Sequence, residues 1–127
     1  MDTNAIKQFA CDFVDKNRLN LKNLSSFIWN NPETAFKEFK SHNIITTFLE
    51  DQGFDVSRET PLTTSFIACS SGNNIDVVVG VCCEYDALPV IGHACGHNLI
   101  AESSIGAALG NSSDLSILFY EIFKMKV

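Results

Sequence analysis

Residues 82–101, CCEYDALPVIGHACGHNLIA, join an apolar run to a stretch of small residues, and they hold two of the three histidines and three of the five cysteines in the chain. The apolar run before them, Asp76 to Cys83, predicts a strand that is covered on both faces and is therefore central in an α/β sheet. The small residues after them, Asn98 to Leu109, predict a helix packed close to another element. Because ligands of open α/β sheets bind beyond the carboxyl ends of strands, this loop is placed for a functional site.

The chain before the loop has helical periodicity first. Apolar residues recur at steps of three and four over residues 4–16, 21–30 and 35–52, which predicts three helices. Pro32 breaks the chain after the second helix, and Gly53 suits the C-terminal cap of the third.

The third of these helices is expected to have one buried side and one solvated side. Its buried side is predicted to carry Phe36, Phe39, Ile45, Phe48 and Leu49. His42 lies among polar neighbours and is interpreted as a solvated surface residue.

Strand periodicity follows Gly53. Residues 54–59, 64–70 and 74–85 are short segments rich in β-branched and aromatic residues, bounded by Gly, Ser, Asn and Pro, and each predicts a strand. Helices followed by strands, without repeats or linkers, indicate one compact α/β unit.

The composition fits a single small domain. The chain has 127 residues, of which 46% are hydrophobic, so it can bury a real core. Its formal net charge of −6 is spread along the length, which predicts neither a nucleic-acid partner nor a membrane surface. The N-terminal stretch lacks the pattern of a targeting signal, and no apolar run reaches the roughly 20 residues of a membrane span. A cytoplasmic protein is expected.

The five cysteines are odd in number and lack the spacing of a disulfide framework, which favours reduced thiols. Cys82 and Cys83 lie in an apolar run, so they are interpreted as two small buried side chains without a chemical role.

The loop also has the residue types of a metal site. His93, Cys95 and His97 alternate, so an extended backbone would point all three side chains the same way. Thiolate and imidazole both suit zinc and other borderline transition metals. Asp86 could accept a hydrogen bond from a ligating imidazole and orient it.

Two other interpretations compete with a metal site on residue types alone. A buried cysteine beside a loop histidine is common, so this pair alone favours an ordinary buried turn. With His93, Asp86 and Pro89 included, the residue types support a buried turn and a metal site about equally. Nucleophilic catalysis by Cys95, activated by His93 or His97, is weaker, because catalytic partners usually come from separate parts of a chain.

The stretch EYDALPVIGHACGHNLIA resembles the signature of the metallopeptidase and amidohydrolase family that includes aminoacylase, carboxypeptidase G and plant auxin-conjugate hydrolases. Asp86 to Pro89 match its Asp-Ala-Leu-Pro element, and His93 to His97 match its His-Ala-Cys-Gly-His element. The flanking Glu-Tyr and Asn are most similar to the branch of β-alanyl dipeptidases and aminobenzoyl-glutamate hydrolases. Residues 31–56 are similar to the family's N-terminal helix, and the resemblance covers roughly residues 5–110.

The resemblance implies an α/β fold in which helices pack on a mixed sheet, as in the N-terminal part of a zinc-peptidase-like catalytic domain. Residues 1–110 would form this part, and residues 111–127 a divergent tail whose apolar run could be a strand or a short helix. Pro32, Glu33 and Glu38 match a segment whose role looks structural.

For the site, the resemblance implies that Cys95 and His97 are metal ligands and that Asp86 is the carboxylate that orients the metal shell. His93 lies in the motif without an assigned ligand role. Family members use a divalent metal pair, zinc or manganese, with a glutamate as general base, to hydrolyse amide C–N bonds in dipeptides or N-acyl amino acids.

Parts of the family pattern have no match in the chain. The general base and a ligand would come from an adjacent Glu-Glu pair, but Glu102, Asp114 and Glu121 are the only carboxylate residues after Asp86, and no histidine follows His97. The domain through which family members often form homodimers is also without a match. We therefore expect a truncated form that is inactive. The alternative is a non-catalytic remnant or interaction module that binds metal weakly.

Overall fold

The structure is a computed structural model that describes residues 3–70, 78–111 and 116–120. Its elements in chain order are the helix α1 (Thr3–Asn30), the helix α2 (Phe39–Asp51), the strands β1 (Asp55–Arg58), β2 (Phe66–Ser70) and β3 (Val78–Cys82), a short 3-10 helix (His93–Cys95), the helix α3 (His97–Asn111) and the strand β4 (Ser116–Tyr120). Among these residues, no helix has both the length and the apolar composition of a membrane span.

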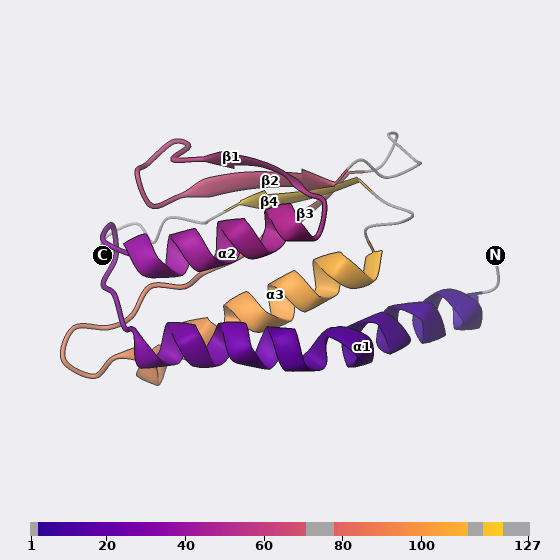
Figure 1. The fold of residues 1–127 in the computed structure, drawn as a ribbon, viewed down its shortest axis with the longest axis horizontal. Helices are drawn as coiled ribbons and strands as arrows, with labels where there is room; N and C mark the ends of the chain where they lie inside the picture. The colour runs from indigo at the N-terminus through magenta and orange to yellow at the C-terminus, as the bar shows by residue number, and fades with distance from the viewer. Residues whose placement is uncertain (1–2, 71–77, 112–115, 121–127) are drawn as a thin grey trace.

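The four strands form one mixed sheet in the order β1-β2-β4-β3 (Figure 1). β1 pairs with β2 and β2 with β4 in antiparallel fashion, whereas β3 and β4 are parallel. Parallel neighbours need a crossover, and the loop and α3 provide it. The expected α/β class with a mixed sheet is therefore confirmed, and the apolar run in the tail forms a strand.

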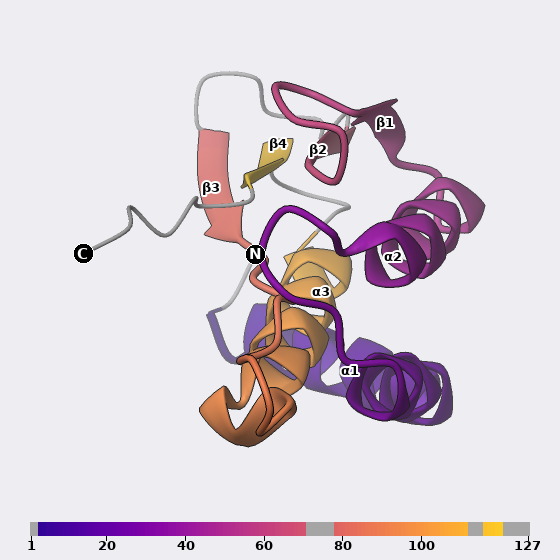
Figure 2. The same ribbon diagram turned by 90° about the vertical axis from the view of Figure 1, so that its left-hand side faces the viewer.

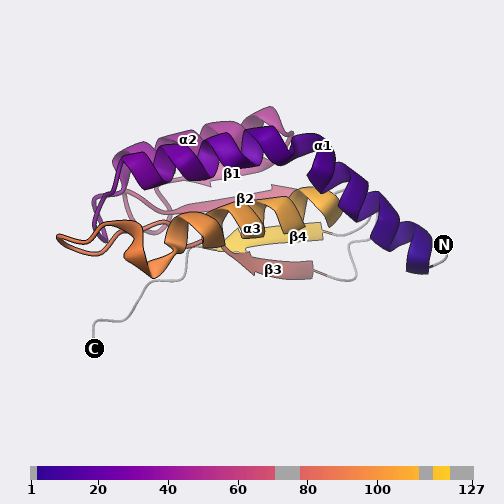
Figure 3. The ribbon, with the colours of Figure 1, turned by 90° about the horizontal axis from the view of Figure 1, so that it is seen from below.

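All three helices lie on the same side of the sheet, as Figures 2 and 3 show. α2 and α3 lie next to the strands, and α1 lies beyond them and packs along α3. The core fills the space between these layers. Its buried members include Leu21, Leu24 and Ile28 of α1, Ile45 and Leu49 of α2, Phe66 and Ala68 of β2, and Ala101, Ile105 and Ala108 of α3.

The small residues of α3 allow α1 to approach it closely. A Cβ atom added to Gly106 would lie 3.4 Å from Cδ1 of Leu21, and one added to Gly110 would lie 3.4 Å from Cβ of Ala10. This confirms the predicted close packing of the small-residue helix. It also fixes the position of the first turn of α3, where the loop residues enter the helix.

The prediction of separate helices at the N-terminus was wrong, because α1 is continuous from Thr3 to Asn30. Residues 17–20 contain neither Gly nor Pro, and the side-chain amide of Asn17 donates to the carbonyl of Phe13 at 2.9 Å without interrupting the helix. The break before Pro32 is where the sequence placed it.

The prediction for the next helix was wrong at its start. α2 begins at Phe39 rather than near residue 35, because Phe36 has a φ of 69° and residue 34 instead forms a β-bridge with Ala87. Phe36 and Phe39 are 52% and 57% exposed and do not belong to the buried side of α2.

β3 is not central, which corrects the expectation drawn from its apolar run. β4 lies between β2 and β3, so β3 ends the described sheet. Val78 and Val79, whose side chains point to opposite faces of this edge strand, are 59% and 39% exposed. Cys82 is exposed as well, although Cys83 is buried as predicted. All five cysteines lie in the described residues, and none forms a disulfide bond there.

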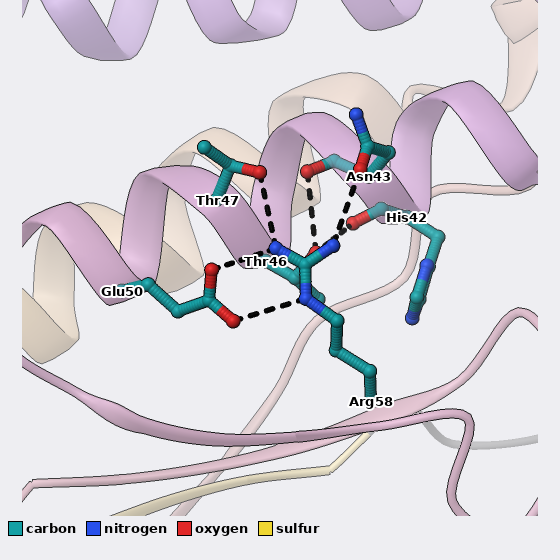
Figure 4. Close-up of polar contacts among 6 residues, drawn as sticks. All are labelled: His42, Asn43, Thr46, Thr47, Glu50 and Arg58. Atoms are coloured by element: carbon teal, nitrogen blue, oxygen red, sulfur yellow. Dashed lines mark hydrogen bonds and ion pairs between the residues drawn. The ribbon is translucent and has the colours of Figure 1, made fainter.

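His42 is buried rather than solvated, with 7% of its surface exposed. Its Nε2 lies 3.2 Å from the carbonyl oxygen of Ser65, and its ring packs 6.4 Å from that of Phe66. Beside it, Arg58 of β1 reaches across to α2 and donates to the Glu50 carboxylate at 3.0 and 2.7 Å (Figure 4). The polar neighbours of His42 in the sequence do not reveal this, because strands β1 and β2 cover it only in the folded chain.

Truncation of Ile28 tests the core. Ile28→Ala is expected to lower the free energy of unfolding by about 2–5 kcal/mol, because Ile28 is fully buried between the layers. Trp29→Ala is the matched control on the same helix, since Trp29 is 55% exposed, and should cost much less. Urea unfolding followed by circular dichroism measures both. Equal losses would contradict the described orientation of α1.

Burial of His42 predicts a stability that depends on pH. Burial lowers the pKa of His42 and nearby Arg58 lowers it further, whereas the Ser65 carbonyl and Glu59 oppose them. As the pH falls through about 6.5, the unfolded chain binds a proton at this residue before the folded chain does. The contribution of neutral His42 to the free energy of unfolding is therefore present above about pH 6.5 and is lost as the pH falls below it.

Urea unfolding at about pH 8 and about pH 5.5 measures this effect. The loss of stability on acidification should be smaller in His42→Gln than in the unaltered chain, since only position 42 differs between them. The same loss in both chains would rule out a depressed pKa of His42.

Candidate metal centre

The chain keeps its strand-like alternation for several residues after β3. Cys83, Tyr85 and Ala87 are buried, whereas Glu84 and Asp86 are partly exposed. This period of two places the two carboxylates on one side of the chain and the three apolar anchors on the other. The anchors therefore determine the direction in which the carboxylates point.

Tyr85 is the main anchor of this segment. Its ring is fully buried and stacks on Phe66 with the ring centroids 6.1 Å apart. Its hydroxyl donates a short hydrogen bond to the carbonyl of Thr64. Both contacts tie the end of β3 to the start of β2, across the position that β4 occupies in the sheet.

The connection between α1 and α2 supports the loop from outside. The amide of Ala87 donates to the carbonyl of Glu33 at 2.7 Å, and a Cβ atom added to Gly92 would lie 3.7 Å from Cβ of Pro32. The Glu33 carboxylate accepts from the amides of Lys40 and Ser41 at the start of α2. The structural role predicted for the Pro-Glu element is confirmed.

Glu38 is a buried carboxyl group beside this support. It accepts hydrogen bonds from the hydroxyl of Thr64 at 2.6 Å and from the amide of Phe36 at 2.8 Å. Burial raises the pKa of Glu38, and the negative charge of Asp86 adds to the rise, although the hydrogen bonds oppose it. Both oxygens of Glu38 are engaged in holding the chain, in agreement with its predicted structural role.

His97 lies between the two carboxylates of the alternating segment. It is the first residue of α3 and is 5% exposed. Its Nδ1 lies 2.5 Å from Oδ1 of Asp86, and its Nε2 lies 3.3 Å from Oε2 of Glu84. The imidazole thus has a carboxylate beside each of its ring nitrogens, Asp86 at Nδ1 and Glu84 at Nε2.

The alternation expected for His93, Cys95 and His97 is absent. His93 to Cys95 form a 3-10 turn rather than an extended segment, and Gly92 and Gly96 on either side have φ values of 61° and 82°. The thiol of Cys95 lies 3.7 Å from the main-chain oxygen of Asp86 and can donate to it. In the part of the chain that the structure describes, no group of three or more His, Cys, Asp and Glu side chains is arranged to hold a metal ion.

His93 is buried, with 3% of its surface exposed, and within the described residues neither ring nitrogen has a hydrogen-bond partner. Burial lowers the pKa of His93 and nearby His97 lowers it further, while the carbonyl of Ile28 and the carboxylate of Asp86 act in the opposite direction. The ring thus lies near the Ile28 carbonyl without a hydrogen bond of good geometry, and a buried imidazole in this state is uncommon in folded proteins. The side-chain oxygen of Asn98, at the start of α3, is likewise buried without a partner within the described residues.

Glu84 is the carboxylate beside His97 that the sequence did not single out. It lies two residues before Asp86 at the end of β3, so the same alternation that aims Asp86 at His97 aims Glu84 there as well. This spacing was the available signal. In the sequence Glu84 only flanks the Asp-Ala-Leu-Pro element, and its approach to His97 depends on the folded loop.

Comparison with known proteins relates the chain to hydrolases. It is 40% identical over 114 residues to a protein named Xaa-Arg dipeptidase from Mus musculus, and this match covers 83% of the chain and 26% of that protein. The Homo sapiens Xaa-Arg dipeptidase is 38% identical over 117 residues, with 83% and 27% covered. No family model matches the chain.

A bacterial relative extends this relationship. A subunit of the p-aminobenzoyl-glutamate hydrolase of Escherichia coli is 31% identical over 123 residues, which cover 82% of the chain and 25% of that protein. The chain spans about a quarter of the length of these curated relatives. Together with the motifs of the loop, these matches show that the chain is a homologue of the N-terminal part of the metallopeptidase and amidohydrolase family.

Proposed function

We propose that this chain carries part of the metal centre of a hydrolase that cleaves amide C–N bonds in dipeptides or N-acyl amino acids. The observation that carries the proposal is the orientation of His97, whose Nδ1 is held by Asp86 while its Nε2 faces Glu84. Metal-ligating histidines typically make this kind of contact to a carboxylate through the ring nitrogen that does not bind the metal. The names of the dipeptidase and hydrolase relatives support the reaction class.

The residues of the loop fit a divalent cation, zinc or manganese. Imidazole nitrogen and carboxylate oxygen are ligands for both ions, and a thiolate suits zinc. The nitrogens of His93, buried without a partner, are further donors in the same loop. His97 and Cys95 would hold the metal, with His93 as a possible addition, and Asp86 would orient His97.

Each of these residues has a distinct task in the proposed reaction. A bound divalent metal pair would polarise the amide carbonyl and activate a water molecule. Asp86 keeps the proton of His97 on Nδ1, so that Nε2 remains a lone-pair donor. Burial of His97 keeps competing water away from the ring, and the anchors on Tyr85 keep Asp86 in place.

We further propose that the 127 residues alone do not turn over substrate. A catalytic zinc keeps three protein ligands, and the attacking water needs a base. Among the described carboxyl groups near His97, Asp86 and Glu84 both face the imidazole, and Glu38 is held by two donors. We infer that none of the three serves as the base for the attacking water.

Metal binding tests the proposed centre. His97→Gln is expected to weaken the binding of Zn²⁺ or Mn²⁺ to the purified chain at least about tenfold, because the best-oriented nitrogen donor is lost. His42→Gln removes an imidazole outside the loop and should leave the affinity unchanged. Equilibrium dialysis with metal analysis measures both variants, and circular dichroism verifies their folding. Equal affinities of His97→Gln and the unaltered chain would contradict the proposal.

Activity is tested with the metal-loaded chain on an Xaa-Arg dipeptide and on p-aminobenzoyl-glutamate, followed by chromatography of the products. No turnover above a metal-only blank is expected. Turnover that disappears in His97→Gln would refute the proposed inactivity of the 127 residues and would at the same time support the reaction class.

The alternative function is a non-catalytic interaction module, which the exposed Val78 and Val79 of β3 favour. Sizing the purified chain by light scattering in the same metal titration separates the two. A metal-free chain that self-associates supports the module, whereas a monomer with stoichiometric metal supports the centre.

A further inference from the structure

The two contacts of His97 set a constraint on what lies beside Nε2. An ionised carboxylate only accepts hydrogen bonds, so the 2.5 Å contact with Asp86 places the ring proton on Nδ1. In the neutral imidazole, Nε2 then carries a lone pair. Oε2 of Glu84 is also electron-rich and lies 3.3 Å away. A proton or a cation between these two atoms is needed to make the arrangement favourable.

The distance between Nε2 and Oε2 favours the cation. A hydrogen bond between an imidazolium and a carboxylate has a typical length of about 2.7–2.9 Å. Two ligands of a tetrahedral zinc ion, each about 2.1 Å from the metal, lie about 3.4 Å apart. The observed 3.3 Å agrees with the second arrangement and is long for the first.

A further observation on the same loop points to a bound cation. His93, four residues before His97, is buried and has no partner for either ring nitrogen within the described residues.

We propose that Glu84 is a metal ligand, which shares one divalent cation with Nε2 of His97. The inference rests on the proposed function of the loop as a metal centre, and it names a ligand that neither the motif nor the resemblance assigns. The strand-like alternation after β3 then has two uses, since Asp86 orients the imidazole and Glu84 completes the pair of donors around the ion.

Cation affinity of the full chain tests this ligand. Glu84→Gln is expected to weaken the binding of Zn²⁺ and Mn²⁺ at least about tenfold. Glu102→Gln is the matched control, because it removes the same charge from α3 at a position about 140° around the helix from His97. Equilibrium dialysis with metal analysis gives the affinities, and Co²⁺ absorption spectra report the ligand field. The Co²⁺ spectrum should change in Glu84→Gln and not in Glu102→Gln.

A second variant keeps the test decisive if Glu84→Gln folds poorly. Glu84→His replaces the carboxylate by another metal donor, so it should bind Zn²⁺ at least about tenfold more tightly than Glu84→Gln. Unchanged affinity and spectrum in a folded Glu84→Gln, or a Glu84→His variant no better than Glu84→Gln, would overturn the inference. If His97→Gln loses the cation while Glu84→Gln keeps it, only this inference fails and the metal centre stands.

Discussion

Burial of Tyr85 is the constraint on which the candidate centre depends. The ring lies against Phe66 and the hydroxyl reaches the Thr64 carbonyl, so the segment after β3 cannot rotate about its own axis. In extended backbone the neighbours of a buried residue must point the other way. Glu84 and Asp86 are thereby directed at the first turn of α3, where the two nitrogens of His97 meet them.

The position of His97 depends in turn on the packing of helices. Gly106 and Gly110 let α3 lie close against α1, and this contact fixes the start of α3 relative to the core. Pro32 and Glu33, in the connection after α1, brace the loop from the opposite side through contacts with Gly92 and Ala87. The loop is therefore held between the sheet, α3 and the α1–α2 connection. A metal centre benefits from such support, because ligand orientation determines affinity.

The polar groups around the loop have unequal roles. Glu33 and Glu38 are carboxylates whose oxygens accept hydrogen bonds from amides and a hydroxyl, and they hold the chain in place. Asp86 and Glu84 instead face an imidazole, and His93 has no hydrogen-bond partner within the described residues. Sequence spacing alone does not separate these groups. The difference comes from which amides and hydroxyls the fold places beside each carboxylate.

The sequence by itself determined the local elements and the chemistry of the loop. Periodicity and chain breakers located the end of α1 at Asn30, the strands β1 and β2 and the helix after the loop. Residue types marked Asp86 and His97. These signals depend only on nearby residues. Tertiary structure decided the rest. It made α1 continuous, buried His42 under β1 and β2, and placed β4 between β2 and β3. It also turned the segment from His93 to Cys95 into a 3-10 helix and brought Glu84 close to His97. Each of these outcomes depends on contacts between distant segments, whose packing energy overrides local preference and whose geometry is absent from any short window of sequence.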